Sequence, residues 1–193
     1  MRFATLALAG ALLLSSPLAA ISAPYTLDKS HAHVTFEVGH LGFSTVHGQF
    51  RKFDANIKFD PDDVEATQVN FVIDAASVDT LWEKRDDHIR GKDFLDVANH
   101  PEITFVTKTV TPTGAETADV LGDLTIRGVT QPVTFQAKLN KMGPSPFNPN
   151  QTIAGFTVTG QIDRTKYGVS YAAPAVSAII PIQIELEMSP ATN

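Results

Sequence analysis

The sequence has no cysteine among its 193 residues, which excludes disulfide bonds, thiol chemistry and a lipid anchor on cysteine. Basic side chains are also scarce, because 15 lysines and arginines stand against 21 aspartates and glutamates and give a formal net charge of −6. This acidic balance argues against a nucleic-acid partner and against simple electrostatic attraction to anionic lipid surfaces. The fold must therefore be stabilised by the packing of its apolar residues.

Long apolar runs are missing as well, apart from one near the N-terminus. Arg2 precedes an apolar run at residues 4–14 that is too short to span a bilayer, and mostly small residues follow it up to Ser22. This pattern is typical of a secretory signal peptide and predicts cleavage after Ser22. We therefore expect residues 1–22 to be removed and residues 23–193 to form one soluble domain without a transmembrane segment. In a Gram-negative cell this product would reach the periplasm.

Alternation of apolar and polar residues is the main pattern in the rest of the chain. The clearest example is residues 120–139, where two alternating runs flank a turn at 128–131 and predict a β-hairpin. Similar rows recur and indicate about eight to ten strands. The stretch from Thr80 to Glu83 instead fits a helix-capping box and predicts a short helix that runs to about Arg90. Together they predict an all-β fold with a short helical insertion, either an antiparallel sandwich or a closed barrel.

The apolar faces of these strands mix phenylalanine with glycine and alanine. Small residues that face inward either leave space in a barrel or fit the taper of a packed core, and the spacing favours neither. If the barrel is hollow, its wall is nearly all hydrocarbon, and the residues that we expect to line it and contact a ligand are Phe36, Val38, Phe50, Ile57, Phe71, Ile73, Phe105, Leu124, Ile126, Val133, Phe135, Phe156, Val158, Ile180 and Ile182.

Such a wall would select an apolar chain. Burial of each methylene contributes about 0.8 kcal/mol, whereas association itself costs on the order of 4–15 kcal/mol. A short chain would barely bind, so we expect the ligand to carry a long lipid tail.

Arg85, His88 and Arg90 lie in the densest charged stretch of the chain. The simplest interpretation is a solvated helix face with internal ion pairs. Arg85, however, shares a helical face with apolar residues, which predicts that its guanidinium points toward the protein body and pairs with a carboxylate such as Asp79 or Asp93. If the helix covers a barrel mouth, Arg85, His88 and Arg90 are candidates to contact the polar head of a ligand.

His31 and His33 lie on the same side of a predicted strand, with a spacing that zinc can use. The sequence fixes no third ligand, and such histidines are more often surface or structural residues, so we assign no metal site and no cofactor. No serine has the context of a nucleophile elbow, which leaves a serine–histidine–aspartate triad with little support. A metal-dependent enzyme that uses His31, His33 and a distant carboxylate is the alternative to a binding protein.

Short motifs run in order across nearly the whole chain. They are Asp28-x-x-His31 with Val34 and Phe36, His40-Leu41-Gly42, Gly48-x-Phe50, Ser77-Val78-Asp79-Thr80, Arg85-Asp86-x-His88-Ile89-Arg90, Asp93-Phe94-Leu95-Asp96, Pro101-x-Ile103-Thr104-Phe105, Gly122-Asp123-Leu124-Thr125-Ile126-x-Gly128-Val129-Thr130, and a weaker pair of Arg164 and Tyr167-Gly168. In this combination the sequence resembles the YceI family of exported polyisoprenoid-binding proteins.

The resemblance implies a lipocalin-like antiparallel β-barrel, here of eight strands, whose lumen holds a long isoprenoid or a similar amphiphile. It also implies roles in lipid transport or storage, in isoprenoid quinone metabolism and in stress responses. We therefore expect a non-enzymatic carrier that needs no cofactor. A module that delivers its lipid or quinone to a membrane redox protein is a further interpretation. The natural lipid and the oligomeric state stay open, a homodimer included.

Overall fold

The computed structural model describes residues 23–191, so the predicted signal peptide at 1–22 lies outside the described residues. Within them the chain forms ten strands, which are β1 (Ala23–His40), β2 (Ser44–Phe50), β3 (Phe53–Phe59), β4 (Gln68–Asp74), β5 (Val78–Asp79), β6 (Glu102–Pro112), β7 (Thr117–Ile126), β8 (Val129–Pro144), β9 (Thr152–Asp163) and β10 (Ile179–Pro190). The helices are α1 (Glu83–Arg90) and three short 3-10 helices, η1 (Val64–Ala66), η2 (Ala75–Ser77) and η3 (Arg164–Tyr167). Across 23–191, no helix has the length and apolar character needed to cross a membrane.

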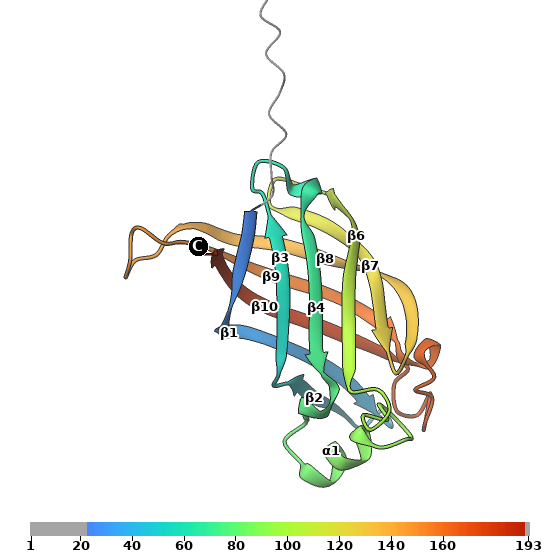
Figure 1. Ribbon diagram of the computed structural model, residues 1–193. Coiled ribbons are helices and arrows are strands. Elements are labelled where there is room, and N and C mark those ends of the chain that lie inside the picture. The colour runs from blue at the N-terminus through green and yellow to red at the C-terminus, as the bar shows by residue number, and fades with distance from the viewer. Residues whose placement is uncertain (1–22, 192–193) are drawn as a thin grey trace, which may run out of the picture.

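Eight of the strands close into a ring. They pair in the order β1, β3, β4, β6, β7, β8, β9 and β10, and β10 pairs with β1 to complete the circle, with every pairing antiparallel. In Figure 1, β3, β4 and β6 form the near wall, and β8, β9 and β10 cross behind them. The predicted eight-stranded antiparallel barrel with a short helical insertion is therefore confirmed, and the sandwich is excluded.

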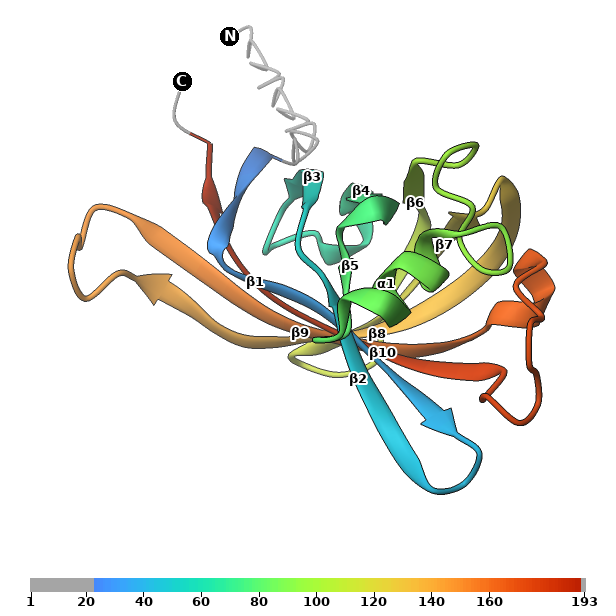
Figure 2. The same ribbon diagram turned by 90° about the horizontal axis from the view of Figure 1, so that it is seen from below.

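β1 makes the closure possible by bending. Its register against β10 shifts between Asp28 and His33, which marks a bulge. Before the bulge the other edge of β1 pairs with β3, and after it that edge pairs with β2. β2 and β3 are separated by Arg51 and Lys52 alone. As a result the barrel closes at the upper end of Figure 1, while the β1–β2 hairpin projects from the lower end, as seen in Figure 2.

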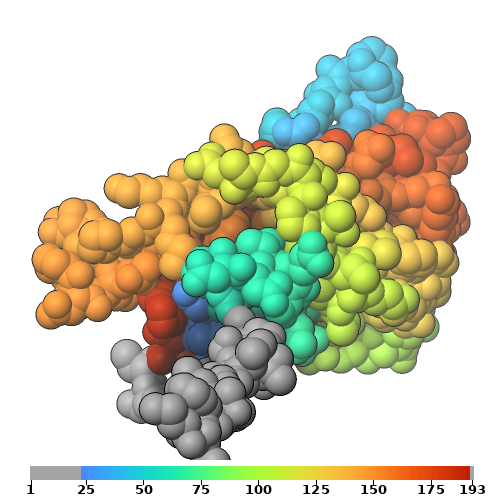
Figure 3. Space-filling model, turned by 90° about the horizontal axis from the view of Figure 1, so that it is seen from above, coloured from blue at the N-terminus to red at the C-terminus, as the bar shows by residue number. Residues whose placement is uncertain are grey.

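The hairpin predicted at 120–139 corresponds to β7 and β8. Its strands pair as far as Ile126 opposite Val129. The turn is shorter than the sequence indicated, because Arg127 and Gly128 alone connect the strands, with positive φ angles of 50° and 73°. A two-residue turn of this kind matches the twist of the strands that it joins. Figure 3 shows that a second hairpin, β8–β9, projects well away from the barrel body.

Glycines of the inner wall lie beneath phenylalanine rings of neighbouring strands. A Cβ atom added to Gly122 would lie 2.4 Å from Cζ of Phe105, so the ring occupies the space of the missing side chain. Small inward residues at these positions therefore serve close packing within the wall. The pairs are Gly48 with Phe36, Gly122 with Phe105, and Gly160 with Phe135.

We expect Gly122→Ala to destabilise the barrel. Its Cβ would also lie 2.6 Å from the carbonyl oxygen of Val106, a backbone atom that cannot move without distorting the ladder. Overpacking of this kind costs about 1–3 kcal/mol, which urea denaturation would measure. Gly143→Ala is the matched control in β8, because nothing lies within 4 Å of its added Cβ. Equal free energies of unfolding for the two variants would contradict this account of the wall.

Candidate ligand-binding cavity

The barrel encloses a cavity of about 810 Å³. All eight strands of the ring contribute to its wall, together with β2 and β5. The wall extends from upper-end turns, represented by Pro61 and Ala115, to α1 and the β9–β10 connection at the lower end (Figure 1). The volume falls within the range of about 300–1,000 Å³ that is usual for small-molecule sites. The cavity therefore follows the barrel from one end to the other.

The structure places fourteen of the fifteen residues expected to line a hollow barrel on the cavity wall. Val133 is the exception. It is half-buried and packs against the main cluster of buried apolar residues, which includes Leu124 and Phe135, but it does not reach the wall. That the others contact a ligand stays a prediction. The fourteen are Phe36, Val38, Phe50, Ile57, Phe71, Ile73, Phe105, Leu124, Ile126, Phe135, Phe156, Val158, Ile180 and Ile182.

Charged and basic side chains on the wall gather at its two ends. Arg85, His88 and Arg164 belong to the lower end, whereas Glu116 belongs to the turn between β6 and β7 at the upper end. The strand positions between these ends contribute mainly aliphatic and aromatic side chains. The cavity is therefore apolar along its length, with basic groups at the end where α1 lies (Figure 2).

The segment before α1 differs from the prediction. The capping box is wrong, because α1 begins at Glu83 with Trp82 at its N-cap and no side-chain cap. The hydroxyl of Thr80 donates instead to Asp86, whose residue is only 3% exposed. The N–H of Thr80 donates to the same carboxylate oxygen at 2.9 Å. A buried carboxylate thus anchors the chain that enters the helix.

Arg85 reaches the cavity wall, but without the carboxylate partner that we expected. Its Nε donates to Oγ1 of Thr80 at 2.6 Å, and its guanidinium also donates to the Thr80 carbonyl. Arg85 therefore approaches the charge of Asp86 through the shared threonine. The two expected partners are engaged elsewhere, Asp79 with Arg51 at 2.6 Å and Asp93 with His88 at 3.0 Å.

Three rings join α1 and its following loop to the β9–β10 connection. The centroid distances are 5.0 Å from His88 to Phe94, 5.1 Å from His88 to Tyr171 and 5.3 Å from Phe94 to Tyr171. All three side chains line the cavity. This aromatic contact therefore closes part of the lower end. The sequence pattern did not indicate Phe94 or Tyr171 as wall residues, because neither lies in a strand.

Arg90, the third predicted head-group residue, does not reach the wall. Its Nε donates to the carbonyl of Ala76 at 2.9 Å and its second terminal nitrogen to that of Val78 at 3.1 Å, which fastens α1 to η2 and β5. Burial lowers the pKa of its guanidinium, but ion pairs with Glu83 and Asp87 outweigh this and leave the pKa raised. Arg90 therefore has a structural role: it holds α1 against the preceding segment.

η3 brings two further polar side chains to the wall. Arg164 is 7% exposed, and its guanidinium stacks 5.8 Å from the centre of the Phe94 ring. Burial lowers the pKa of Arg164, with Asp163 opposing the shift. Tyr167 is 2% exposed, and burial raises its pKa to about 12. Its hydroxyl is buried and has no hydrogen-bond partner within the described chain. The motif of Arg164 with Tyr167-Gly168 is the sequence signal for this place, but it does not reveal the unpartnered hydroxyl.

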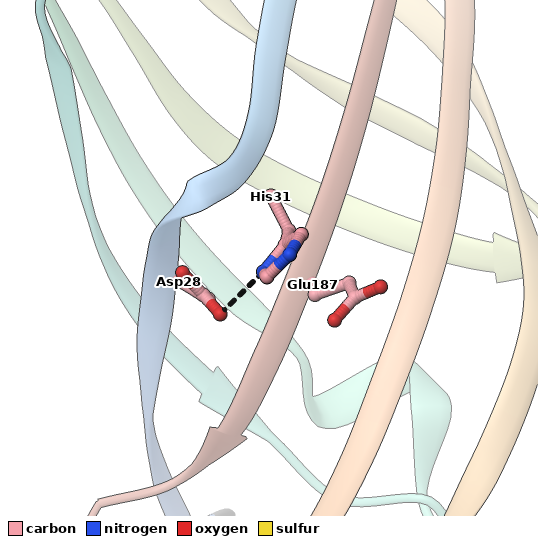
Figure 4. Close-up of side chains that lie close together, drawn as sticks. All are labelled: Asp28, His31 and Glu187. Carbon is pink, nitrogen blue, oxygen red and sulfur yellow. Dashed lines mark hydrogen bonds and ion pairs between the residues drawn. The ribbon is translucent and has the colours of Figure 1, made fainter.

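A separate group of polar side chains lies away from the cavity, at the bulge of β1 and on β10 (Figure 4). Ligand atoms of Asp28, His31 and Glu187 lie within 4.8 Å of one another. Nδ1 of His31 is 2.9 Å from the Asp28 carboxylate, and this hydrogen bond is the main cause of the raised pKa of His31. His33 lies opposite Glu185 in the ladder. The structure therefore groups His31 with two carboxylates rather than with His33.

A known family matches nearly the whole barrel. The family model described as "YceI-like domain" matches residues 25–188, from Tyr25 near the start of β1 to Met188 near the end of β10. The chain belongs to the YceI family. The resemblance drawn from the short motifs is thereby confirmed.

Relatives in this family agree with the match. A UPF0312 protein of Pseudomonas savastanoi pv. phaseolicola is 40% identical over 186 residues, which cover 95% of this chain and 94% of that one. The crystal structure of BcnA from Burkholderia cenocepacia superposes with a TM-score of 0.76 at 26% identity, over 86% of this chain and 99% of that one. A polyisoprenoid binding domain from Saccharophagus degradans has a TM-score of 0.66 at 16% identity, over 89% and 100% respectively, and shows the same fold.

We expect Asp86→Ala to loosen the lower end. The variant leaves the buried N–H and hydroxyl of Thr80 without their acceptor, which costs about 1–3 kcal/mol. Urea denaturation would measure the loss, and hydrogen exchange would show faster opening of α1. Asp87→Ala is the control, because it removes an exposed carboxylate that pairs with Arg90 and should change stability by less than about 0.5 kcal/mol. Similar stabilities for the two variants would show that Asp86 does not anchor the helix.

Proposed function

We propose that the protein binds a long-chain polyisoprenoid or isoprenoid-quinone-like lipid inside its barrel, and that it carries or stores this lipid in the periplasm. The observation that supports the proposal most directly is the cavity of about 810 Å³, apolar along its length and basic at one end. A long tail fits such a wall because each buried methylene contributes about 0.8 kcal/mol. The wall also offers few polar groups that an apolar chain would leave unsatisfied.

The isoprenoid character of the tail rests on the family rather than on the cavity, which by itself specifies only a long apolar chain. The Saccharophagus degradans domain of the same fold is described as polyisoprenoid binding. Membership of the YceI family supports the transfer of that ligand class to this chain. On the same basis we propose roles in isoprenoid quinone metabolism and in stress responses.

The hydrogen-bond partners of the polar side chains on the cavity wall support a carrier without catalytic activity. General acid–base or nucleophilic chemistry needs paired groups within hydrogen-bond reach of the reacting atoms. On the wall, Arg164 donates to backbone carbonyls, and no hydroxyl of the described residues is hydrogen-bonded to the His88–Asp93 pair, which therefore lacks a nucleophile to activate. Asp28, His31 and Glu187 lie off the wall, so a metal-dependent reaction there would not act on a lipid in the cavity. We therefore infer a binding protein that needs no cofactor, with delivery to a membrane redox protein as one use of the bound lipid.

Native mass spectrometry of the protein purified from periplasm, followed by organic extraction, is expected to show close to one long isoprenoid lipid per chain. Phe71→Asp should abolish this retention, because Phe71 lies on the wall and an unpaired carboxylate there faces only apolar groups. Circular dichroism would establish that the variant folds.

The matched control is Val72→Asp. It introduces the same charge on the same strand at a position that does not reach the cavity wall, so the lipid should be retained. Full retention by a folded Phe71→Asp variant would refute the pocket. A wild-type protein that is purified without lipid and also fails to bind added polyprenol would refute the proposed function itself.

Periplasmic export is a separate expectation. The full chain expressed in a Gram-negative host should be recovered from the periplasmic fraction with a mass that begins at Ala23, because small residues at Ala20 and Ser22 fit signal peptidase. Intact-mass spectrometry of each fraction would measure this. Replacing Ala20 and Ser22 with arginine should block cleavage. Recovery of an unprocessed wild-type chain in the cytoplasm would exclude the proposed location.

A further inference from the structure

The hydroxyl of Tyr167 is a buried donor without an acceptor. The Tyr167 residue is 2% exposed, it lines the cavity, and no described residue bonds to its hydroxyl. Native structures rarely leave such a group unsatisfied, because burial removes its hydrogen bonds to water. Like any tyrosine, Tyr167 keeps its proton at neutral pH, and its burial raises the pKa further, to about 12, so the hydroxyl is available as a donor. A molecule in the cavity is the available source of an acceptor.

Arg164 supplies an independent observation at the same place. It lies three residues before Tyr167 in η3, so the two side chains leave the same short helix. Its guanidinium is buried and lines the cavity, yet each of its hydrogen bonds runs to a neutral carbonyl oxygen. The acceptors are the backbone carbonyls of Ser177, Val169, Tyr171 and Val176, at 2.8, 2.7, 3.1 and 2.8 Å. These four bonds satisfy four of the five guanidinium N–H donors but do not neutralise the charge.

The positions of these groups along the barrel make the two ends of the cavity chemically different. Arg164 and Tyr167 share the lower end with the basic residues Arg85 and His88, whereas Glu116 and the likewise unpaired hydroxyl of Thr67 stand at the upper end, where no described residue places a basic group on the wall. An acceptor-rich or anionic group is favoured at the lower end, and the tail then extends through the apolar middle. An ammonium head would meet a cation there instead.

We propose that Tyr167 and Arg164 form the head-group site of the cavity, in which the Tyr167 hydroxyl donates to an oxygen of the lipid head and the head lies at the α1 end. This proposal rests on the proposed function, since it assumes a lipid in the barrel, and it adds the chemical class of the head and its direction. The head is a small group with acceptor oxygens, such as an alcohol, a carbonyl or a phosphate, and a negative charge strengthens binding through Arg164.

The test compares Tyr167→Phe with the wild type, both delipidated and refolded to the same circular dichroism spectrum. The probes are phytanyl phosphate, phytanol and phytane, which share one saturated branched chain and differ only in the head. The wild type should bind the phosphate most tightly and phytane least. Tyr167→Phe should weaken binding of the phosphate and of the alcohol by about 3- to 10-fold, the effect of one hydrogen bond, and leave phytane unchanged.

Stability of the empty protein gives a second measurement. Removing an unpaired buried hydroxyl should raise the melting temperature of empty Tyr167→Phe, although the same change weakens binding. The matched control is Tyr25→Phe, since Tyr25 is 8% exposed, packs with Ile57 and Phe59 in a separate apolar cluster and is not part of the cavity wall. It should bind all three probes like the wild type.

The outcomes separate the two proposals. A wild type that binds none of the probes overturns the proposed function. If it binds all three and Tyr167→Phe weakens them equally or not at all, the barrel is a lipid carrier but the assignment of Tyr167 is wrong. If the phosphate binds no more tightly than the alcohol, the proposed contribution of Arg164 to binding a negatively charged head is refuted.

Discussion

Closure of the ring through β1 is the constraint on which the rest of the structure depends. β1 pairs with β10 on both sides of the bulge between Asp28 and His33, and the same bend transfers its other edge from β3 to β2. Closure removes exposed edges from the ring and encloses the apolar faces of eight strands. It also directs the β1–β2 hairpin away from the axis (Figure 2). The lower end is therefore covered by α1 and the β9–β10 connection rather than by strands.

Packing within the wall explains why the closed ring is hollow. Rings such as Phe105 and Phe135 lie over glycines of neighbouring strands, so their volume is taken up in the wall instead of along the axis. The result is dense packing around the circumference and a cavity of about 810 Å³ in the middle. Side chains that face an empty space lack partner atoms there and forfeit dispersion contacts. An apolar ligand restores those contacts, which couples the stability of the barrel to its occupancy.

Alternation predicted the strands and most of the wall because a period of two follows from backbone geometry alone. It could not distinguish a barrel from a sandwich, since closure depends on pairing between β1 and β10 at opposite ends of the chain; the family motifs supplied that step. The incorrect predictions also have physical causes. Thr80 and Glu83 fit a capping box, but the carboxylate of Asp86, six residues after Thr80 and buried in the folded chain, takes the hydroxyl instead. Arg90 and Val133 have the right character but lie beside the cavity, and the unpaired state of Tyr167 depends entirely on its three-dimensional surroundings.

The cover of the lower end is held differently from the ring. The ring is held by continuous ladders, whereas α1 has eight residues and is too short to be stable on its own. Polar contacts hold it, chiefly those of Arg90 and Asp86, together with the rings of His88, Phe94 and Tyr171. Local opening of such a segment requires less free energy than opening the ring.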